Sequence, residues 1–282
     1  MKAGKASRTA LRVATILVTL NELPEWASRL PADMPELTER LVLAAGIDKY
    51  GADMIADCKT EKTIANFARF EKKEPGMFEG LGHRKLFMEA QFSAAMADGI
   101  KQVAIIGAGF DTLCLRHAAK HPDVSFIELD HPATQAAKRK GLEEIGLPDN
   151  LHLIAADLGK KPLQSVMKEA EDAGHWARSD PALFIVEGLL MYLRPSEVKD
   201  LFERIALCGA AKSRVAFSHL NSLKRYYFAQ LVVRLMSEPW RSAADASNLN
   251  SYLTDHWHIL HTAPGQTDRD LEGFALAELK QI

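Results

Sequence analysis

The chain has 282 residues, 47% hydrophobic and 26% charged, which is typical of a globular protein with a sizeable core. A net charge of −2 excludes a strongly basic surface, so we expect neither nucleic acid nor an anionic membrane as a partner. The three cysteines, Cys58, Cys114 and Cys208, are far apart and form no C-x-x-C pair, which argues against a disulfide framework and favours a cytoplasmic setting.

Residues 1–100 are predicted to form a helical cap. The apolar run 13–20 is too short for a membrane span of roughly 18 residues, and no small-residue cleavage site follows it. We therefore interpret it as the first amphipathic helix. Apolar residues recur every three or four positions through 37–55 and 86–96, which indicates further helices, and no strand is predicted before Val103.

After Val103, short β-rich runs alternate with helical segments, which predicts βαβ units and a mostly parallel sheet over residues 101–282. The predicted strands are 103–107, 124–129, 151–156, 182–186, 213–220, 257–262 and 274–279. The predicted helices are 112–120, 132–145, 162–173, 195–208 and 223–236. Because no helix separates the last two strands, we expect them to form an antiparallel pair that closes a doubly wound α/β sheet.

Glycines and acids follow the ends of four successive predicted strands. These residues are Gly107, Gly109, Asp130, Asp157 and Glu187. In an open α/β sheet, ligands bind outside the carboxyl ends of the strands. The pattern therefore predicts a crevice that binds a nucleoside.

The turn Gly107-Ala-Gly109 allows a sharp bend and a close approach of backbone to ligand. A dinucleotide fingerprint would have a third glycine where this chain has Thr112, and Asp111 would repel a pyrophosphate. A cationic or neutral ligand is favoured. A nicotinamide-dependent oxidoreductase is the disfavoured alternative.

Asp130 lies 21 residues after Gly109, where an acid can accept hydrogen bonds from both ribose hydroxyls. Glu128 points to the same side of the strand and competes for this role. Asp157 could accept a hydrogen bond from an adenine amino group. Each acid could instead cap a helix, and Asp130 before His131-Pro132 is a good candidate for that.

Together these motifs resemble the leucine carboxyl methyltransferase family of S-adenosylmethionine-dependent enzymes. The segments that carry the resemblance are 7–10, 75–76, Arg84, 107–112, 128–132, 156–158 and 187–193. The resemblance covers roughly residues 5 to 260 and implies a class I methyltransferase fold, a Rossmann-like sheet. The sequence Ser237-Glu-Pro-Trp240 is similar to the branch that methylates polyketides.

The resemblance also implies roles for single residues in binding S-adenosylmethionine. Arg84 would meet the methionine carboxylate, and Glu187 would approach the amino group. The turn at Gly107 and Gly109 would pass close to the methionine moiety. The ribose would be held by Asp130, and the adenine would be framed by Asp157 and Leu158. The chain departs from the family pattern at Lys85 and Leu113, where threonine and arginine are frequent.

The acceptor side carries weaker signals. A carboxylate acceptor needs no base, whereas a hydroxyl gains from one, most often histidine. Tyr192 and His219 follow strands four and five and are candidate catalytic residues, although each could equally be structural. Trp240 and Trp257 could line an acceptor pocket or pack in the core.

We expect no metal site, because no acid or cysteine completes a ligand set around His256, His258 and His261. The predicted function is S-adenosylmethionine-dependent O-methylation of a carboxyl or hydroxyl group on a small molecule. Two alternatives stay open: methylation of a protein C-terminal carboxylate, and a non-catalytic module that binds the cofactor for regulation or assembly.

Overall fold

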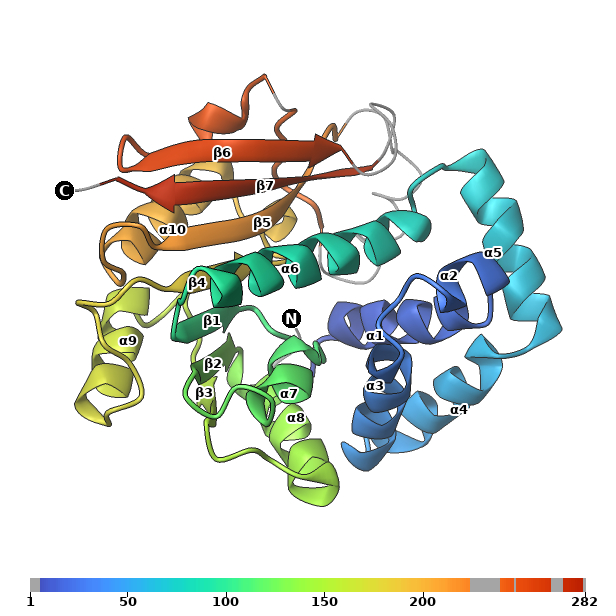
Figure 1. Ribbon diagram of the computed structural model, residues 1–282. Coiled ribbons are helices and arrows are strands. Elements are labelled where there is room, and N and C mark those ends of the chain that lie inside the picture. The colour runs from blue at the N-terminus through green and yellow to red at the C-terminus, as the bar shows by residue number, and fades with distance from the viewer. Residues whose placement is uncertain (1–5, 224–238, 246, 265–270, 281–282) are drawn as a thin grey trace.

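The computed structural model describes residues 6–223, 239–245, 247–264 and 271–280, and is built around one mixed sheet (Figure 1). The described strands lie in the order β3-β2-β1-β4-β5-β7-β6. They are β1 (Gln102–Ile106), β2 (Ser125–Asp130), β3 (Leu151–Ala155), β4 (Leu183–Val186), β5 (Arg214–Leu220), β6 (Trp257–Pro264) and β7 (Glu272–Leu279). β1 to β5 pair in parallel, and β7 pairs antiparallel with both β5 and β6. The predicted sheet is confirmed, including its antiparallel end.

The helices also follow the predicted order. Before the sheet come α1 (Arg8–Asn21), α2 (Pro24–Ala27), α3 (Asp33–Ala44), α4 (Asp48–Cys58), α5 (Glu61–Lys73) and α6 (Glu79–Ala97). Between the strands lie α7 (Leu113–Ala118), α8 (Pro132–Ile145), α9 (Leu163–Asp172) and α10 (Pro195–Ala206). The helix predicted at 223–236 lies almost wholly outside the described residues. No helix in the described ranges combines the length and hydropathy needed to cross a membrane.

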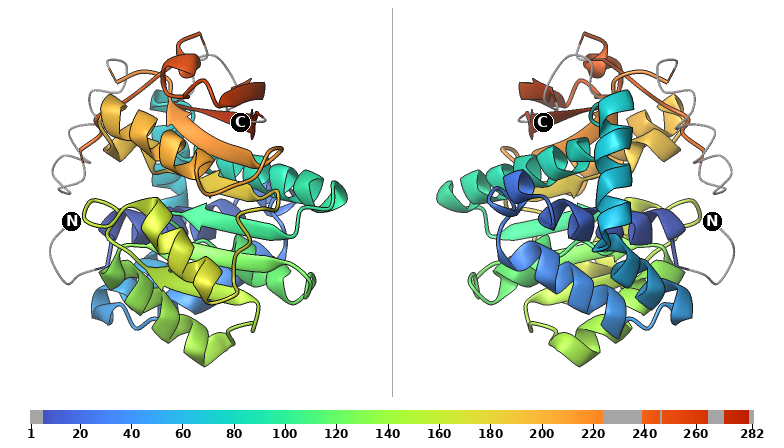
Figure 2. Two further views of the ribbon diagram at one scale, coloured as in Figure 1. Left: turned by 90° about the vertical axis from the view of Figure 1, so that its left-hand side faces the viewer. Right: turned by 90° about the vertical axis from the view of Figure 1, so that its right-hand side faces the viewer.

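Helices cover both faces of the sheet (Figure 2). Side chains alternate along β1, so that Val103 and Ile105 face a core shared with α6, α7 and α8. Ala104 and Ile106 face the opposite core, which α9 and α10 complete. This alternation explains why β1 is a continuous apolar run, since a parallel strand is buried on both faces.

The helix α6 lies along the sheet rather than with α1 to α5 (Figure 1). Its residues Phe87, Met88 and Phe92 belong to the same core as the strands. At its first turns it also meets the cap: a Cβ on Gly82 would lie 2.2 Å from the ring of Trp26, so only glycine fits there. α6 therefore joins the cap to the sheet, and a domain boundary near residue 100 stays a prediction.

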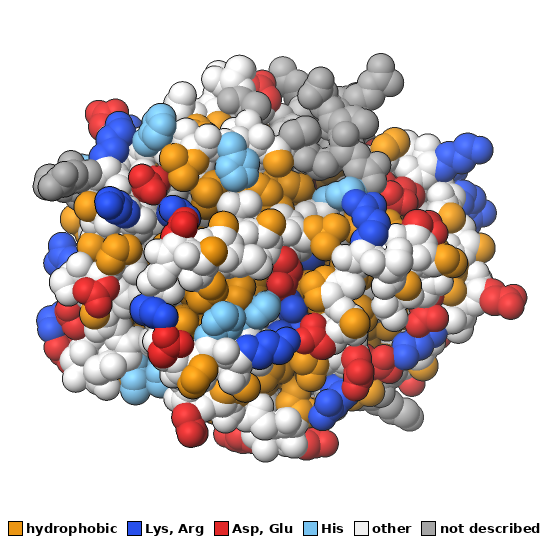
Figure 3. All heavy atoms as spheres, viewed as in Figure 1, with side chains coloured by type: hydrophobic (Ala, Val, Ile, Leu, Met, Phe, Trp, Pro, Cys, Tyr) orange, Lys and Arg blue, Asp and Glu red, His pale blue; other side chains and the backbone are white. Residues whose placement is uncertain are grey.

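Charged side chains of both signs are interspersed over the face of the molecule in Figure 3, in keeping with the net charge of −2. One charged pair lies in the core. Glu128 on β2 and Lys138 on α8 are fully buried, with Nζ 2.5 Å from Oε2. Lys138 also donates a hydrogen bond to the backbone carbonyl of Asp111 at 2.6 Å. The pair ties α8 to the sheet and to the loop after β1.

Removing one partner of this pair should leave the other charge buried and unpaired. We expect Lys138→Met to lower the free energy of unfolding by about 3–5 kcal/mol, measured by urea denaturation. The double variant Lys138→Met/Glu128→Gln should recover most of that loss. Lys140→Met, on an exposed position of the same helix, is the matched control and should change stability by under about 0.5 kcal/mol. Equal losses at both lysines would contradict the argument.

Candidate active site

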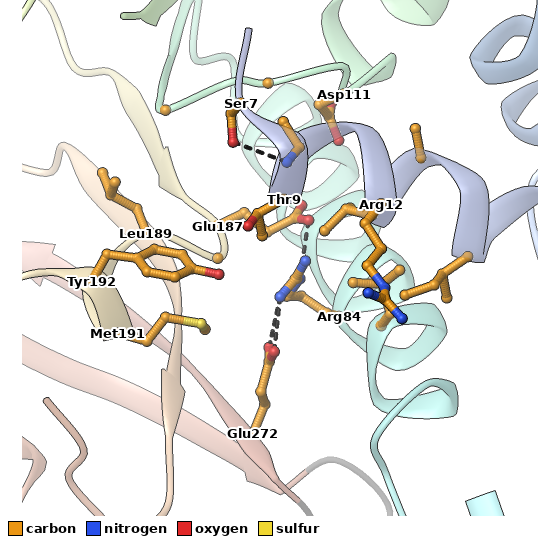
Figure 4. A pocket seen from close by; sticks show the side chains of 18 of the residues that line it. Ser7, Thr9, Arg12, Arg84, Asp111, Glu187, Leu189, Met191, Tyr192 and Glu272 are labelled. Atoms are coloured by element: carbon orange, nitrogen blue, oxygen red, sulfur yellow. Dashed lines mark hydrogen bonds and ion pairs between the residues drawn. The ribbon is translucent and has the colours of Figure 1, made fainter. Parts of the chain in front are cut away.

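A cavity of about 790 Å³ lies at the carboxyl ends of the parallel strands, between the sheet and the helical cap. The predicted strand-end residues all line it: Gly107, Gly109, Asp130, Asp157 and Glu187. Arg84 and Tyr192 also line it, on α6 and on the turn Leu190–Tyr192 that follows β4 (Figure 4). The structure thus brings most of the predicted site residues to one place.

The glycine turn after β1 bends as predicted. Gly107 and Gly109 have φ angles of 78° and 54°, in the left-handed region that favours glycine. A Cβ on Gly109 would lie 3.1 Å from the Cβ of Ala10, because the first turn of α1 packs directly against the loop. Residue 109 therefore has to be small for the cap and the sheet to meet here.

Asp130 holds this turn in place. One carboxylate oxygen accepts from the backbone N–H of Gly109 and the other from that of His131, both at 2.6 Å. Burial raises the pKa of Asp130 despite these two bonds, which act to lower it. Helix α8 is capped by His131, whose Nδ1 accepts from the N–H of Ala133, so Asp130 is not its cap. Glu128 does not line the cavity, since it is buried against Lys138 deeper along the same strand.

Asp157 follows β3 and is only partly buried. It accepts a hydrogen bond from the N–H of Gly159 at 3.1 Å and lies 3.4 Å from Nζ of Lys160. Its neighbour Leu158 is partly buried and packs against the core that α9 and α10 complete. Leu158 is not among the described residues that line the cavity. The role of Leu158 beside an adenine stays a prediction.

Two adjacent cations of α6, Arg84 and Lys85, lie at the centre of a buried charge cluster, each 4% exposed. Arg84 Nε donates to Glu187 Oε1 at 3.0 Å, and its Nη1 donates to both oxygens of Glu272 at 2.8 and 2.9 Å. Lys85 Nζ pairs with Asp111 and lies 2.6 Å from Glu187 Oε1. Three carboxylates thus face two cations.

Lys85 and Asp111 keep their charges despite burial. Burial acts to lower the pKa of Lys85, but Asp111 and Glu187 raise it above its ordinary value. Burial acts to raise the pKa of Asp111, but Lys85 and Lys138 hold it below its usual range. Lys85, which departs from the family pattern, is therefore built into the site by ion pairs. Leu113, the other departure, is buried in the core.

Sequence reasoning missed Glu272. It stands at the start of β7, 188 residues from Arg84, and the rest of that strand is apolar up to Glu278. An acid at the start of an otherwise largely apolar strand was the available signal, because a buried acid needs a buried partner. Asp111 was noted only as a residue that would repel phosphate, whereas its carboxylate anchors Lys85.

The remainder of the cavity wall is mainly apolar. It comes from α1, α5, the loop before α6, the turn after β4, the segment 239–245 and the residue before β7: Val13, Ile16, Leu17, Phe70, Met77, Phe78, Leu189, Met191, Trp240 and Leu271. Trp240 thus lines the cavity, in keeping with the first of the two interpretations given for it above. Trp257 does not, because it is buried in the core with Nε1 donating to the carbonyl of Phe202 at 3.0 Å.

The two candidate catalytic residues are placed differently. Tyr192 projects its hydroxyl into the cavity, toward Glu187 and Arg84 (Figure 4). His219 is 2% exposed, its ring lies against Gly273, and it is absent from the described cavity lining. Burial lowers the pKa of His219 to about 4. His219 therefore lies outside the described lining of this cavity.

The three C-terminal histidines are separate from this cavity. His256 lies 3.3 Å from Glu203 on α10, and the ring of His261 packs near Phe87. Within the part of the chain that the structure describes, no group of three or more His, Cys, Asp and Glu is placed to hold a metal ion.

The buried histidine should make the fold sensitive to acid. The unfolded chain binds a proton at His219 near pH 6.5, while the folded pKa is about 4, so stability present above pH 6.5 is lost as the pH falls toward 4. We expect His219→Gln to remove about 2 kcal/mol of the drop in unfolding free energy between pH 7.5 and 5. His117, with a pKa also lowered by burial to about 4, contributes equally in both proteins. The exposed His258→Gln is the control and should leave the drop unchanged.

Comparison with known proteins agrees with this arrangement. A family model described as leucine carboxyl methyltransferase matches residues 25–206. A Mycobacterium marinum protein, named as an S-adenosyl-L-methionine-dependent methyltransferase, is 30% identical over 197 residues, which cover 64% of this chain and 63% of that protein. A Mycobacteroides abscessus protein with the same name is 30% identical over 151 residues, 54% of this chain and 49% of that one. The chain therefore spans about half to two thirds of the length of these relatives.

Solved structures share the fold. A protein described as a methyltransferase from Thermobifida fusca superposes with a TM-score of 0.62 at 16% identity, over 86% of this chain and 94% of its own. A DUF574-family protein from Streptomyces avermitilis superposes with a TM-score of 0.60 at 11% identity, over 86% of this chain and 96% of its own. At such low identity they support the class I methyltransferase architecture alone. The family match, which spans well over half of the sequence, shows that the chain belongs to the leucine carboxyl methyltransferase family.

Proposed function

We propose that the protein transfers the methyl group of S-adenosylmethionine to an oxygen atom of a small molecule. The observation that carries this proposal is one continuous cavity with two different halves. The strand-end half presents glycine backbone and acids, and the other half is an apolar chamber under the cap. The names of the mycobacterial relatives support the choice of cofactor.

The residues present suit this cofactor. Asp130 presents a carboxylate where a ribose would need one, and the Gly107 turn leaves room for a close approach of backbone to ligand. Arg84 and Glu187 offer opposite charges to the carboxylate and ammonium of an amino acid. The cavity volume lies within the roughly 300–1,000 Å³ of small-molecule sites. When bound, the cofactor supplies an electrophilic methyl group on a positively charged sulfur.

The chain itself has to position the acceptor, because methyl transfer requires an in-line approach of the acceptor oxygen. Apolar side chains of the cap hold the body of the acceptor and exclude water from the reacting oxygen. The Tyr192 hydroxyl, which projects into the cavity, orients that oxygen by a hydrogen bond (Figure 4).

Within this proposal a carboxylate acceptor is favoured over a hydroxyl. No histidine is among the described residues that line the cavity. Its acids Glu187, Glu272 and Asp111 are paired with Arg84 and Lys85, and Asp130 accepts two backbone hydrogen bonds. A carboxylate is already ionised at neutral pH and needs no base. The exposed Arg12 and Arg241 also line the cavity and would attract an anion.

Binding of S-adenosylhomocysteine tests the cofactor half. Asp130→Asn should weaken its affinity about 10- to 100-fold by isothermal titration, which corresponds to about 1.5–3 kcal/mol for hydrogen bonds to a charged group. Asp123→Asn, an exposed acid at the opposite end of β2, is the matched control and should bind like the wild type. NADH is titrated in parallel. Saturable binding of NADH in place of S-adenosylhomocysteine would refute the proposal.

Tyr192→Phe separates the acceptor half from the cofactor half. We expect unchanged S-adenosylhomocysteine affinity and a kcat about tenfold or more below the wild type, since one hydrogen bond to the acceptor is lost. The acceptor comes from a screen of apolar carboxylic acids, matched alcohols and phenols, and peptides with free C-terminal carboxylates. Tyr252→Phe, in the core outside the cavity, is the control and should retain full activity. Turnover of peptides alone would replace the small molecule with a protein acceptor.

A further inference from the structure

The guanidinium of Arg84 is already engaged by two carboxylates of the chain. Nε donates to Glu187 Oε1 at 3.0 Å, and Nη1 donates to both oxygens of Glu272 at 2.8 and 2.9 Å. Figure 4 shows Arg84 between these two acids on the wall of the cavity. A ligand carboxylate that approaches Arg84 therefore meets a cation that already forms ion pairs with two carboxylates of the chain.

Few directions of approach remain. Arg84 is 4% exposed, and Gly188 lies so close that a Cβ there would be 3.2 Å from both Nη1 and Nη2. The other buried cation on this wall, Lys85, is held by Asp111 and by Glu187 at 2.6 Å. Adding a fourth carboxylate to three already facing two cations would be opposed by repulsion in a desolvated site.

The two acids of Arg84 are not equivalent. Glu187 follows β4 directly and forms ion pairs with both Arg84 and Lys85, so two cations hold its carboxylate in place. The described ion pair of Glu272 is with Arg84 alone, through Nη1. Burial raises the pKa of Glu272 although Arg84 acts to lower it.

We propose that Glu272 is an internal competitor of the cofactor: its carboxylate occupies the place on Arg84 Nη1 that the cofactor's carboxylate takes, and it yields that place when the cofactor binds. This inference rests on the proposed function. Glu272 is accordingly a positioning residue, since it acts on the cofactor through Arg84. Its neighbour Leu271 lines the apolar part of the same cavity.

The test compares two ligands that differ in the carboxylate alone: S-adenosylhomocysteine and its decarboxylated analogue, which keeps the amino group. Affinities of both are measured by isothermal titration for the wild type and Glu272→Gln. We expect the variant to bind S-adenosylhomocysteine about tenfold more tightly, because the competing charge is gone, and to show no gain for the analogue. A purely structural role of Glu272 would change both affinities together.

Glu278→Gln, on the same strand, is the matched control and should leave both affinities unchanged. Glu272→Asp keeps the charge but shortens its reach by one methylene; it should also bind S-adenosylhomocysteine more tightly, by a smaller factor. Glu272→Asp replaces Glu272→Gln in the test if Glu272→Gln does not fold, as judged by the absence of a cooperative thermal unfolding transition. A wild type that binds S-adenosylhomocysteine, with folded variants that bind it equally or less well, overturns this inference alone. A wild type that binds neither S-adenosylhomocysteine nor S-adenosylmethionine overturns the proposed function.

Discussion

The geometry of the site depends on a buried series of alternating charges. It runs from the core to the C-terminal strands: Glu128, Lys138, Asp111, Lys85, Glu187, Arg84 and Glu272, with Lys138 joined to Asp111 through the backbone carbonyl of that residue. A desolvated charge is costly unless its partners stay in place, so each ion pair fixes the element that supplies it. Helices α6 and α8, the loop after β1 and the first residue of β7 are held in one arrangement. The cavity is the space that this arrangement leaves.

The cavity therefore has a polar end and an apolar end. The polar end combines the glycine turns with the paired charges of Arg84 and Lys85. The apolar end is formed by side chains of the cap and of the segments after β4 and before β7. Under the proposed function this division matches the chemistry, because the cofactor is constant and presents many polar groups, whereas the acceptor needs shape and exclusion of water.

The sequence predicted the strand-end residues because they follow a local rule: a polar residue after an apolar run lies at the carboxyl edge of a parallel sheet. The sequence did not predict which residues near the end of a strand are covered by a helix and which lie at the open edge of the sheet. Glu128 and Asp130 share a face of β2, yet Glu128 is covered by α8 while Asp130 lies at the open edge. His219 is near the end of β5 as predicted, but residues far along the chain cover that end. Glu272 meets Arg84 across 188 residues, a pairing that no local pattern encodes.

The contact of Ala10 with Gly109 has a consequence for how such a chain diversifies. Under the proposed function, Phe70 of α5 and Met77 of the loop before α6 border the apolar end, so a change of either side chain would reshape the space for an acceptor. The first turn of α1 is more constrained, because the Cβ of Ala10 already fills the space that a side chain at residue 109 would need. A larger residue at position 10 would press on the glycine turn itself. Selection for new substrates should therefore act on one wall of the cavity while the first turn of α1 stays unchanged.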